Sequence, residues 1–156
     1  MSTVADGLYQ FGGMPVGPGA PFPFVPKSAN YWFVDGTNGA DGNSGKTVKR
    51  PFATIQRALD LATANDCVVV FPKKLTALAA VPNYYNETLT IKNAQSNLSL
   101  IGVCNGKLWE GKPVVRANTT TSTALLTVRA PGVFISGMGF QGQAGAAGTY
   151  NTGGGI

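Results

Sequence analysis

The sequence predicts an all-β chain whose centre is a short β-solenoid, a fold in which repeated strand units stack on one another. Residues 89–103 recur as residues 126–138, with an offset of 37 in the first half and 35 in the second. Each half alternates apolar and polar residues, as a strand with one buried face does. The chain has 21 Gly and 10 Pro and only 12% charged residues, a composition that suits strands and turns. A repeat of this length indicates a unit that must stack on a copy of itself.

Residues 1–30 are predicted to form an extended docking arm. Prolines between Pro15 and Pro26 exclude a helix and a central strand. A disordered linker is one interpretation, but linkers are poor in large apolar residues and this arm is rich in them. We therefore expect it to dock on the body of its own chain or on another subunit. The residues expected to dock are Leu8, Tyr9, Phe11, Met14, Val16, Phe22 and Phe24.

Residues 31–66 are predicted to form an entry strand, a turn rich in Asn, Gly and Asp, and one amphipathic helix at 51–62. The helix begins at Pro51 or after a Thr54 cap. Phe52, Ile55 and Leu59 share its apolar face. We expect this face to cap the first turn of the solenoid, whose apolar interior and backbone edge would otherwise meet water.

The turn before this helix contains Asp and Asn residues in a spacing that invites comparison with a calcium loop. A calcium loop that started at Asp41 would need a bidentate Glu twelve positions along, where the chain has Phe52. The turn is therefore predicted to be structural, and the sequence predicts no metal site.

Residues 67–140 are predicted to form the solenoid itself, with two or three turns. A buried strand at 67–71 opens it, and a loop follows at 73–81. Further strands are expected at 89–92, 98–103, 114–116, 125–128 and 133–140. The Gly- and Ala-rich tail at 141–156 supplies no further strand.

The two cysteines, Cys67 and Cys104, are separated by 37 residues, which equals one repeat. This spacing predicts that they occupy matching places in neighbouring turns. Two free thiols are expected in a cytosolic protein, and a disulfide is the alternative.

The charge pattern and hydropathy exclude several classes of protein. No apolar run reaches the roughly 18 residues that span a bilayer, and the first residues do not form a signal peptide. We therefore expect a soluble protein made in the cytosol, with no membrane partner. The net charge is +5, and we interpret its basic residues as parts of solvated turns. The alternative is that they attract the protein to an anionic surface. No nucleic-acid-binding module is present in the sequence, so no nucleic-acid partner is expected.

Two motifs resemble the start of right-handed parallel β-helix domains of the pectate-lyase-like superfamily. Residues 31–41 resemble the family's V-D-x-x-N-G-x-D turn, and residues 51–58 (PFATIQRA) resemble its P-F-x-T-I-Q-x-A capping helix. The step at 82–91 resembles the family's entry into the first rungs, with Asn83 in place of Gly and one extra residue, and gives Glu87 a structural position. The likeness covers about residues 31–140 and implies a right-handed parallel β-helix. Residues 7–17 resemble the openings of small tailed-phage structural proteins.

Candidate catalytic groups are scarce. The chain has seven acids and no His, which removes the commonest general base. Hydrolysis of a polysaccharide needs two carboxylates facing one bond, yet only Glu110 lies late in the repeats. The sequence therefore predicts no catalytic residue, no cofactor and no small-molecule substrate. Lys107 and Trp109 have two interpretations. Either Lys107 pairs with a sugar on which Trp109 stacks, or the aromatic ring covers the edge of a turn.

These observations predict a non-enzymatic structural protein of a virus particle, a decoration (cement) protein on a tailed-phage capsid. We expect it to be made in the host cytoplasm and to stabilise the head by binding the major capsid protein across capsomers. A homo-oligomer is expected, and analogy gives a trimer. One alternative is a carbohydrate-binding or tailspike or tail-fibre-type β-helix module attached to the virion through its arm. Another is a truncated β-helix enzyme, if the natural chain continues past Ile156.

Overall fold

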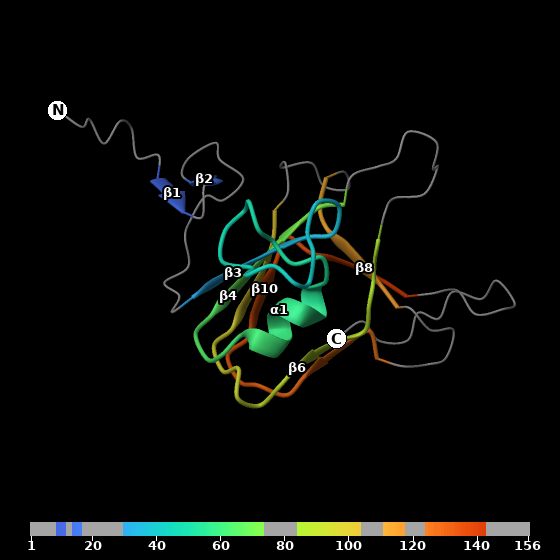
Figure 1. Ribbon diagram of the computed structural model, residues 1–156. Coiled ribbons are helices and arrows are strands. Elements are labelled where there is room, and N and C mark those ends of the chain that lie inside the picture. Colours follow the sequence, from blue (N-terminus) through green and yellow to red (C-terminus); the bar gives the residue numbers. More distant parts are fainter. Residues whose placement is uncertain are drawn as a thin grey trace, which may run out of the picture.

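The computed structural model describes residues 30–73, 84–103, 111–117 and 124–142, and the backbone of residues 9–11 and 14–16. This part of the chain is all-β, with mostly parallel strands and one short helix (Figure 1). The elements are β1 (Tyr9–Phe11), β2 (Met14–Val16), β3 (Tyr31–Asp35), α1 (Ile55–Leu61), β4 (Cys67–Phe71), β5 (Tyr85–Asn86), β6 (Leu89–Ile91), β7 (Ser99–Gly102), β8 (Val114–Arg116), β9 (Leu126–Val128), β10 (Phe134–Ser136) and β11 (Gly139–Gln141).

Three parallel sheets make up the body of the protein. The largest sheet has the order β3–β4–β7–β10, the second β5–β8–β11 and the third β6–β9. After β3 the chain visits the sheets in a fixed cyclic order: β4, β5 and β6 place one strand in each, β7, β8 and β9 repeat this round, and β10 and β11 begin a third. Parallel neighbours need long connections, and here the other strands of each round supply much of that connection.

Strand pairing confirms the repeat that the sequence predicts. Leu89 pairs with Leu126 and Ile91 with Val128, which is the offset of 37. Ser99 pairs with Phe134, which is the offset of 35. Residues that match in the two copies are therefore hydrogen-bonded neighbours, and the repeat describes physical stacking.

The strand expected at 133–140 is instead two strands. β10 ends at Ser136 and β11 begins at Gly139. Gly137 lies between them with a φ of 68°, in the left-handed region that favours glycine. A side chain at Gly137 would collide with the backbone of Gly102, the matching glycine of the preceding round. The bend lets the chain pass from the first sheet to the second.

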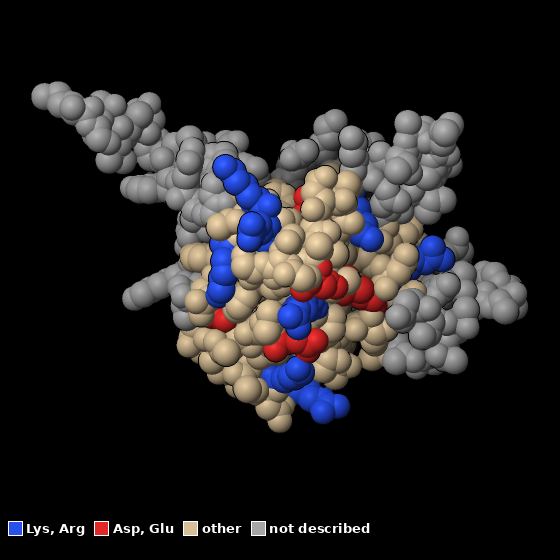
Figure 2. All heavy atoms as spheres, viewed as in Figure 1, with Lys and Arg blue, Asp and Glu red and all other residues tan. Residues whose placement is uncertain are grey.

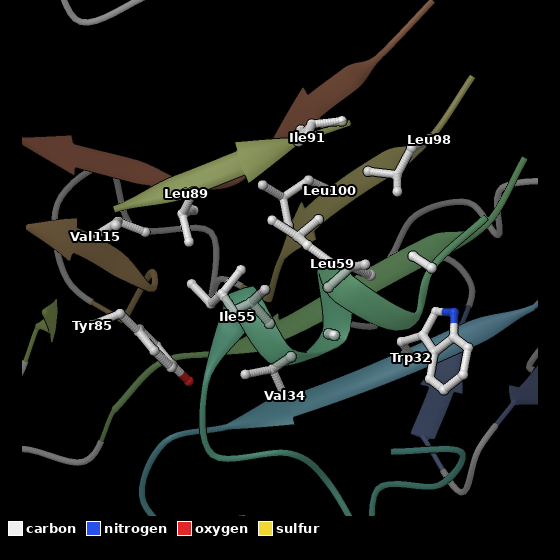
Figure 3. Close-up of a cluster of buried hydrophobic side chains, with 14 of the residues drawn as sticks. Trp32, Val34, Ile55, Leu59, Tyr85, Leu89, Ile91, Leu98, Leu100 and Val115 are labelled. Atoms are coloured by element: carbon white, nitrogen blue, oxygen red, sulfur yellow. The ribbon is translucent and has the colours of Figure 1, made fainter. Parts of the chain in front are cut away.

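The main core lies between the sheets and α1. Ile55, Ala58 and Leu59 of α1 are fully buried. Figure 3 shows Ile55 and Leu59 between Val34 and Trp32 of β3 on one side and Ile91 and Leu100 on the other. Helix α1 begins at Ile55 after a Thr54 cap, which is the second of the two predicted starts, so Phe52 precedes the helix while remaining in the same core.

A second apolar cluster lies on the opposite face of the first sheet. It consists of Phe33, Cys67, Val69, Ile101 and Val103, all buried, with Tyr31, Val48 and Phe71 packed against them. The first sheet is thus apolar on both faces over β3, β4 and β7, which is typical of buried parallel strands.

The register of β4 overturns the expected matching of the two cysteines. Cys67 pairs with Ser99, an offset of 32 rather than 37, so the spacing of the cysteines does not equal the local repeat. The connection from β5 to β6 is shorter than its later counterpart from β8 to β9, which shortens the offset. Cys104 lies outside the described residues.

In the arm, the backbone of β1 and β2 forms an antiparallel pair in which Tyr9 is opposite Val16. The sequence predicted an extended arm whose prolines exclude a helix and a central strand. Pro15 lies in β2, and a two-stranded sheet accepts proline because each strand has an edge that needs no donor.

Candidate functional site

The predicted docking residues of the arm fall mostly beyond the described structure. Leu8, Phe22 and Phe24 lie outside the described residues, and for Tyr9, Phe11, Met14 and Val16 only the backbone is described. Docking by the arm therefore stays a prediction. The sites that can be built from described residues lie at the two ends of the body. We call the end formed by β3, α1 and β6 the closed end, and the end formed by β9, β10 and β11 the open end.

At the closed end, the turn after β3 folds back and satisfies the outer edge of that strand. The backbone N–H of Phe33 donates to the carbonyl of Gly45 at 2.8 Å. The N–H of Phe52 donates to the carbonyl of Phe33, and Asp35 donates to that of Phe52, both at 2.9 Å. Edge groups that would attract another strand are thereby paired within the chain.

The edge of β6 is closed by a side chain. The Gln56 amide on α1 accepts from the N–H of Thr90 at 2.9 Å and donates to its carbonyl at 3.4 Å. One carboxamide thus takes the place of a neighbouring strand for one residue of β6.

Two carboxylates hold the N-terminus of α1. Asp41 accepts from the N–H groups of Ala53 (2.9 Å) and Thr54 (3.0 Å). Glu87, from the segment between β5 and β6, accepts from the N–H groups of Ile55 (3.1 Å) and Gln56 (2.8 Å). These bonds satisfy donors that a helix start leaves unpaired. Burial raises the pKa of Glu87, and the two backbone N–H groups lower it by less.

The C-terminus of α1 is held by Gln95. Its amide donates to the carbonyl oxygens of Leu59 and of Ala62, the latter at 3.0 Å. Its oxygen accepts from the N–H of Lys92 at 2.6 Å. Gln95 is buried, so this short helix is fixed at both ends by residues that come more than thirty positions later in the chain.

Asp66 is a fully buried carboxylate at the start of β4. It accepts from Trp32 Nε1 (3.0 Å), from Asn30 Nδ2 (3.0 Å), and from the backbone N–H (2.8 Å) and hydroxyl (3.1 Å) of Thr63. Burial by itself raises the pKa of Asp66, but these donors outweigh it and hold the pKa below its usual value. The carboxylate therefore ties β3 to the segment that joins α1 to β4.

The remaining described acids also bond within the chain. Asp35 accepts from the backbone N–H groups of Thr37 (2.8 Å) and Asn38 (3.1 Å) and so shapes the turn. Asp60 pairs with Lys92 at 2.7 Å, and this hydrogen bond is the largest cause that lowers the pKa of Asp60. Both side chains of this pair are largely exposed.

The chemistry open to these carboxylates follows from their bonds. In the described ranges, all five acids accept hydrogen bonds from groups of the same chain. Four of them hold a turn, a helix end or a strand in place, and Asp60 bonds to the side chains of Gln56 and Lys92. In these ranges no group of three or more His, Cys, Asp or Glu residues could hold a metal ion. Asp41 bonds to the N-terminus of α1, which is a structural role within the turn. Glu110, with Lys107 and Trp109, lies outside the described residues. Helix α1 has seven residues, and no helix in the described ranges is long and apolar enough to cross a membrane.

The open end presents apolar side chains. Among the described strands, β9, β10 and β11 are each the last of their sheet. Phe134 of β10 is 48% exposed and Val128 of β9 is 41% exposed. Ile135, Phe140 and neighbouring apolar residues pack on the core but stay partly exposed.

A polar row runs along the outer face of the second sheet. Strand register aligns Asn86, Arg116 and Gln141 on successive strands. The Arg116 guanidinium lies 5.6 Å from the centre of the Tyr84 ring, and its buried Nε has no hydrogen-bond partner among the described residues. Elsewhere, Figure 2 shows basic and acidic side chains intermixed on the face that it displays rather than separated by sign.

Comparison of the chain with protein-family models, with curated proteins and with solved structures found no match.

Proposed function

We propose that the chain is a non-enzymatic structural protein of a virus particle, and specifically a decoration protein of a tailed-phage capsid. The observation that carries the proposal is the use of the described carboxylates. Asp35, Asp41, Asp60, Asp66 and Glu87 all bond within the protein, which suits a scaffold better than a hydrolytic site that needs two acids facing a substrate.

The architecture that we propose for this scaffold is a short right-handed parallel β-helix. The cyclic visits to three parallel sheets and the stacked repeat support it. Parallel crossover connections are right-handed in nearly all proteins, which supports the hand. An experimental structure that traced the three rounds would test it, and left-handed connections would contradict it.

In this proposal the protein acts by adhesion. Apolar residues of the arm and of the open end bury surface against neighbouring subunits and the major capsid protein, and this burial raises the barrier to rupture of the shell. The resemblance of residues 7–17 to the openings of small phage structural proteins supports a virion partner. A homo-oligomer, a trimer by analogy, would place several arms on one capsomer.

The test uses particles of the phage that encodes the chain. Antibody-labelled electron microscopy should locate the protein on the head, and particles that lack it should release DNA at a lower temperature. Adding the purified chain should restore heat resistance, whereas a variant with Phe22→Asp and Phe24→Asp should restore less. The proposal would be contradicted by antibody label on the tail. It would also be contradicted if particles that lack the protein released DNA at the same temperature as complete particles.

A carbohydrate-binding or tailspike-type module is the second candidate, and the polar row on the second sheet favours it. Guanidinium and carboxamide groups at strand spacing beside an aromatic ring suit a saccharide with hydroxyl or carboxylate groups. Calorimetric titration with bacterial surface polysaccharides, using Arg116→Ala as the matched variant, separates the candidates. Binding that Arg116→Ala abolishes would favour the module, and no binding would leave the decoration protein.

A further inference from the structure

Among the described strands, β10 is the last of its sheet, and its outer edge at Ile135 offers one specific place for an added strand. Phe134 donates its backbone N–H to Leu98 at 2.9 Å, on the β7 side. Backbone groups of successive strand residues point to opposite edges, so those of Ile135 point away from β7. Ile135 also faces the core, where it pairs with the buried Leu100, while the neighbouring Phe134 is 48% exposed on the other face.

The arm contains a segment whose sequence suits this edge. Residues 20–25 read APFPFV, with Phe and Pro alternating. In an extended strand Phe22 and Phe24 share one face and direct their backbone groups to one edge. Pro21 and Pro23 direct theirs to the other edge, where they have no N–H to donate. Such a segment can pair with one strand and cannot readily pair with a second.

We propose that residues 20–25 of a second copy of the chain add to β10 as an antiparallel strand. In this arrangement Phe24 lies opposite Ile135 and Val25 lies opposite Phe134, and directly opposed residues place their side chains on the same face of a sheet. Both Phe side chains then extend the core over the open end. Pro23 then lies opposite Ser136, and because the prolines have no N–H to donate, they leave an outer edge that blocks further addition.

The reach of the arm selects a second copy rather than the same chain. Residue 25 would lie beyond β10, while Asn30 lies at the start of β3, four strand positions away in the extended sheet. Four spacings come to about 19 Å. The five residues from 25 to 30 span at most about 18 Å when fully extended, before any detour around side chains. An arm from a neighbouring copy has no such restriction.

This inference rests on the homo-oligomer part of the proposed function and not on its capsid part. Two variants test it. Phe134→Lys places a charge on the edge, a change that blocks strand addition. The double change Phe22→Asp and Phe24→Asp removes the apolar side chains of the arm. Leu61→Lys is the matched control, because Leu61 is 39% exposed on α1, away from β10.

Native mass spectrometry should give the unmodified chain and Leu61→Lys at least twice the chain mass of 16.1 kDa. Each of the other two variants should be monomeric. A mixture of those two should form a complex with one copy of each, because the intact arm of Phe134→Lys fits the intact edge of the arm variant. A monomeric unmodified chain, an oligomer that survives either variant, or a mixture that stays monomeric would overturn the inference. A monomer that still protects phage heads would leave the proposed function standing.

Discussion

The closed end and the open end of this protein both contain strand edges, but the chain covers those edges at only one of the two ends. Each is a place where parallel strands run out and leave backbone groups and apolar side chains at an edge. At the closed end the chain covers both, with the backbone of Gly45 and Phe52 on β3 and the Gln56 amide on β6. At the open end Phe134 and Val128 stay nearly half exposed. Among the described residues, the paired edge groups are therefore concentrated at one end and the exposed apolar side chains of strands at the other.

Among the changes considered, loss of Asp66 should lower the stability of the protein most, because it destabilises the closed end. Asp66→Ala leaves the Trp32, Asn30 and Thr63 donors without their acceptor in a buried site. We expect the free energy of unfolding to fall by at least about 3 kcal/mol. Urea denaturation followed by tryptophan fluorescence measures it. A loss below about 1 kcal/mol would show that the closed end does not depend on this carboxylate.

A side chain at Gly137 should have the next largest effect, and it tests the open end. Gly137→Ala combines a left-handed φ of 68° with a collision against the Gly102 backbone. The expected cost is about 1–3 kcal/mol. Gly42→Ala is the matched control, because a side chain there meets no atom within 4 Å, and it should change stability by at most about 0.5 kcal/mol. Equal effects of the two changes would contradict the close stacking of the two glycines.

Acid should weaken the closed end through Asp66. The folded-state pKa of Asp66 lies below the ordinary 3.8, so its stabilisation is present above that value and is lost as pH falls through the folded pKa. The contribution of Glu87 to stability changes with pH in the opposite direction, because its raised pKa favours the folded protein with Glu87 protonated. Urea midpoints measured from pH 5 to pH 2 should fall less steeply in Asp66→Asn than in the unmodified chain. Parallel curves would exclude Asp66 as a source of the acid sensitivity.

The smallest effect is expected from the surface pair of Asp60 and Lys92. Their side chains are 43% and 54% exposed, so water and salt screen the attraction. Asp60→Asn should cost at most about 0.5 kcal/mol, and 1 M NaCl should remove that difference. A larger cost that persists in salt would mean that this pair belongs with Asp66 as a structural link of the closed end.

Local patterns in the sequence predicted the elements well. The repeat predicted which residues pair, as Leu89 with Leu126 and Ser99 with Phe134 show, because stacked units need matching side chains at matching places. The Thr54 cap and the buried face of α1 followed from helical periodicity.

Contacts between distant residues were not predictable in the same way. The bonds of Glu87 and Gln95 to α1 join residues more than thirty positions apart, and no local motif specifies them. The 32-residue offset between Cys67 and Ser99 depends on loop length, which hydrophobic patterning does not constrain. The resemblance gave Glu87 a structural position but not its partners.

The attachment of α1 has a consequence for how the protein emerges from the ribosome. A seven-residue helix is marginal by itself, and two of the side chains that fix its ends belong to residues 87 and 95. At a synthesis rate of about 5–20 residues per second, the roughly 40 residues from Thr54 to Gln95 take about 2–8 s to make. During that interval β3 and the helix segment have been synthesised, but the later residues that bond to them have not. A part of the chain that is translated early is thus among the last to be completed, and a nascent chain arrested before Gln95 should leave Trp32 open to quenchers.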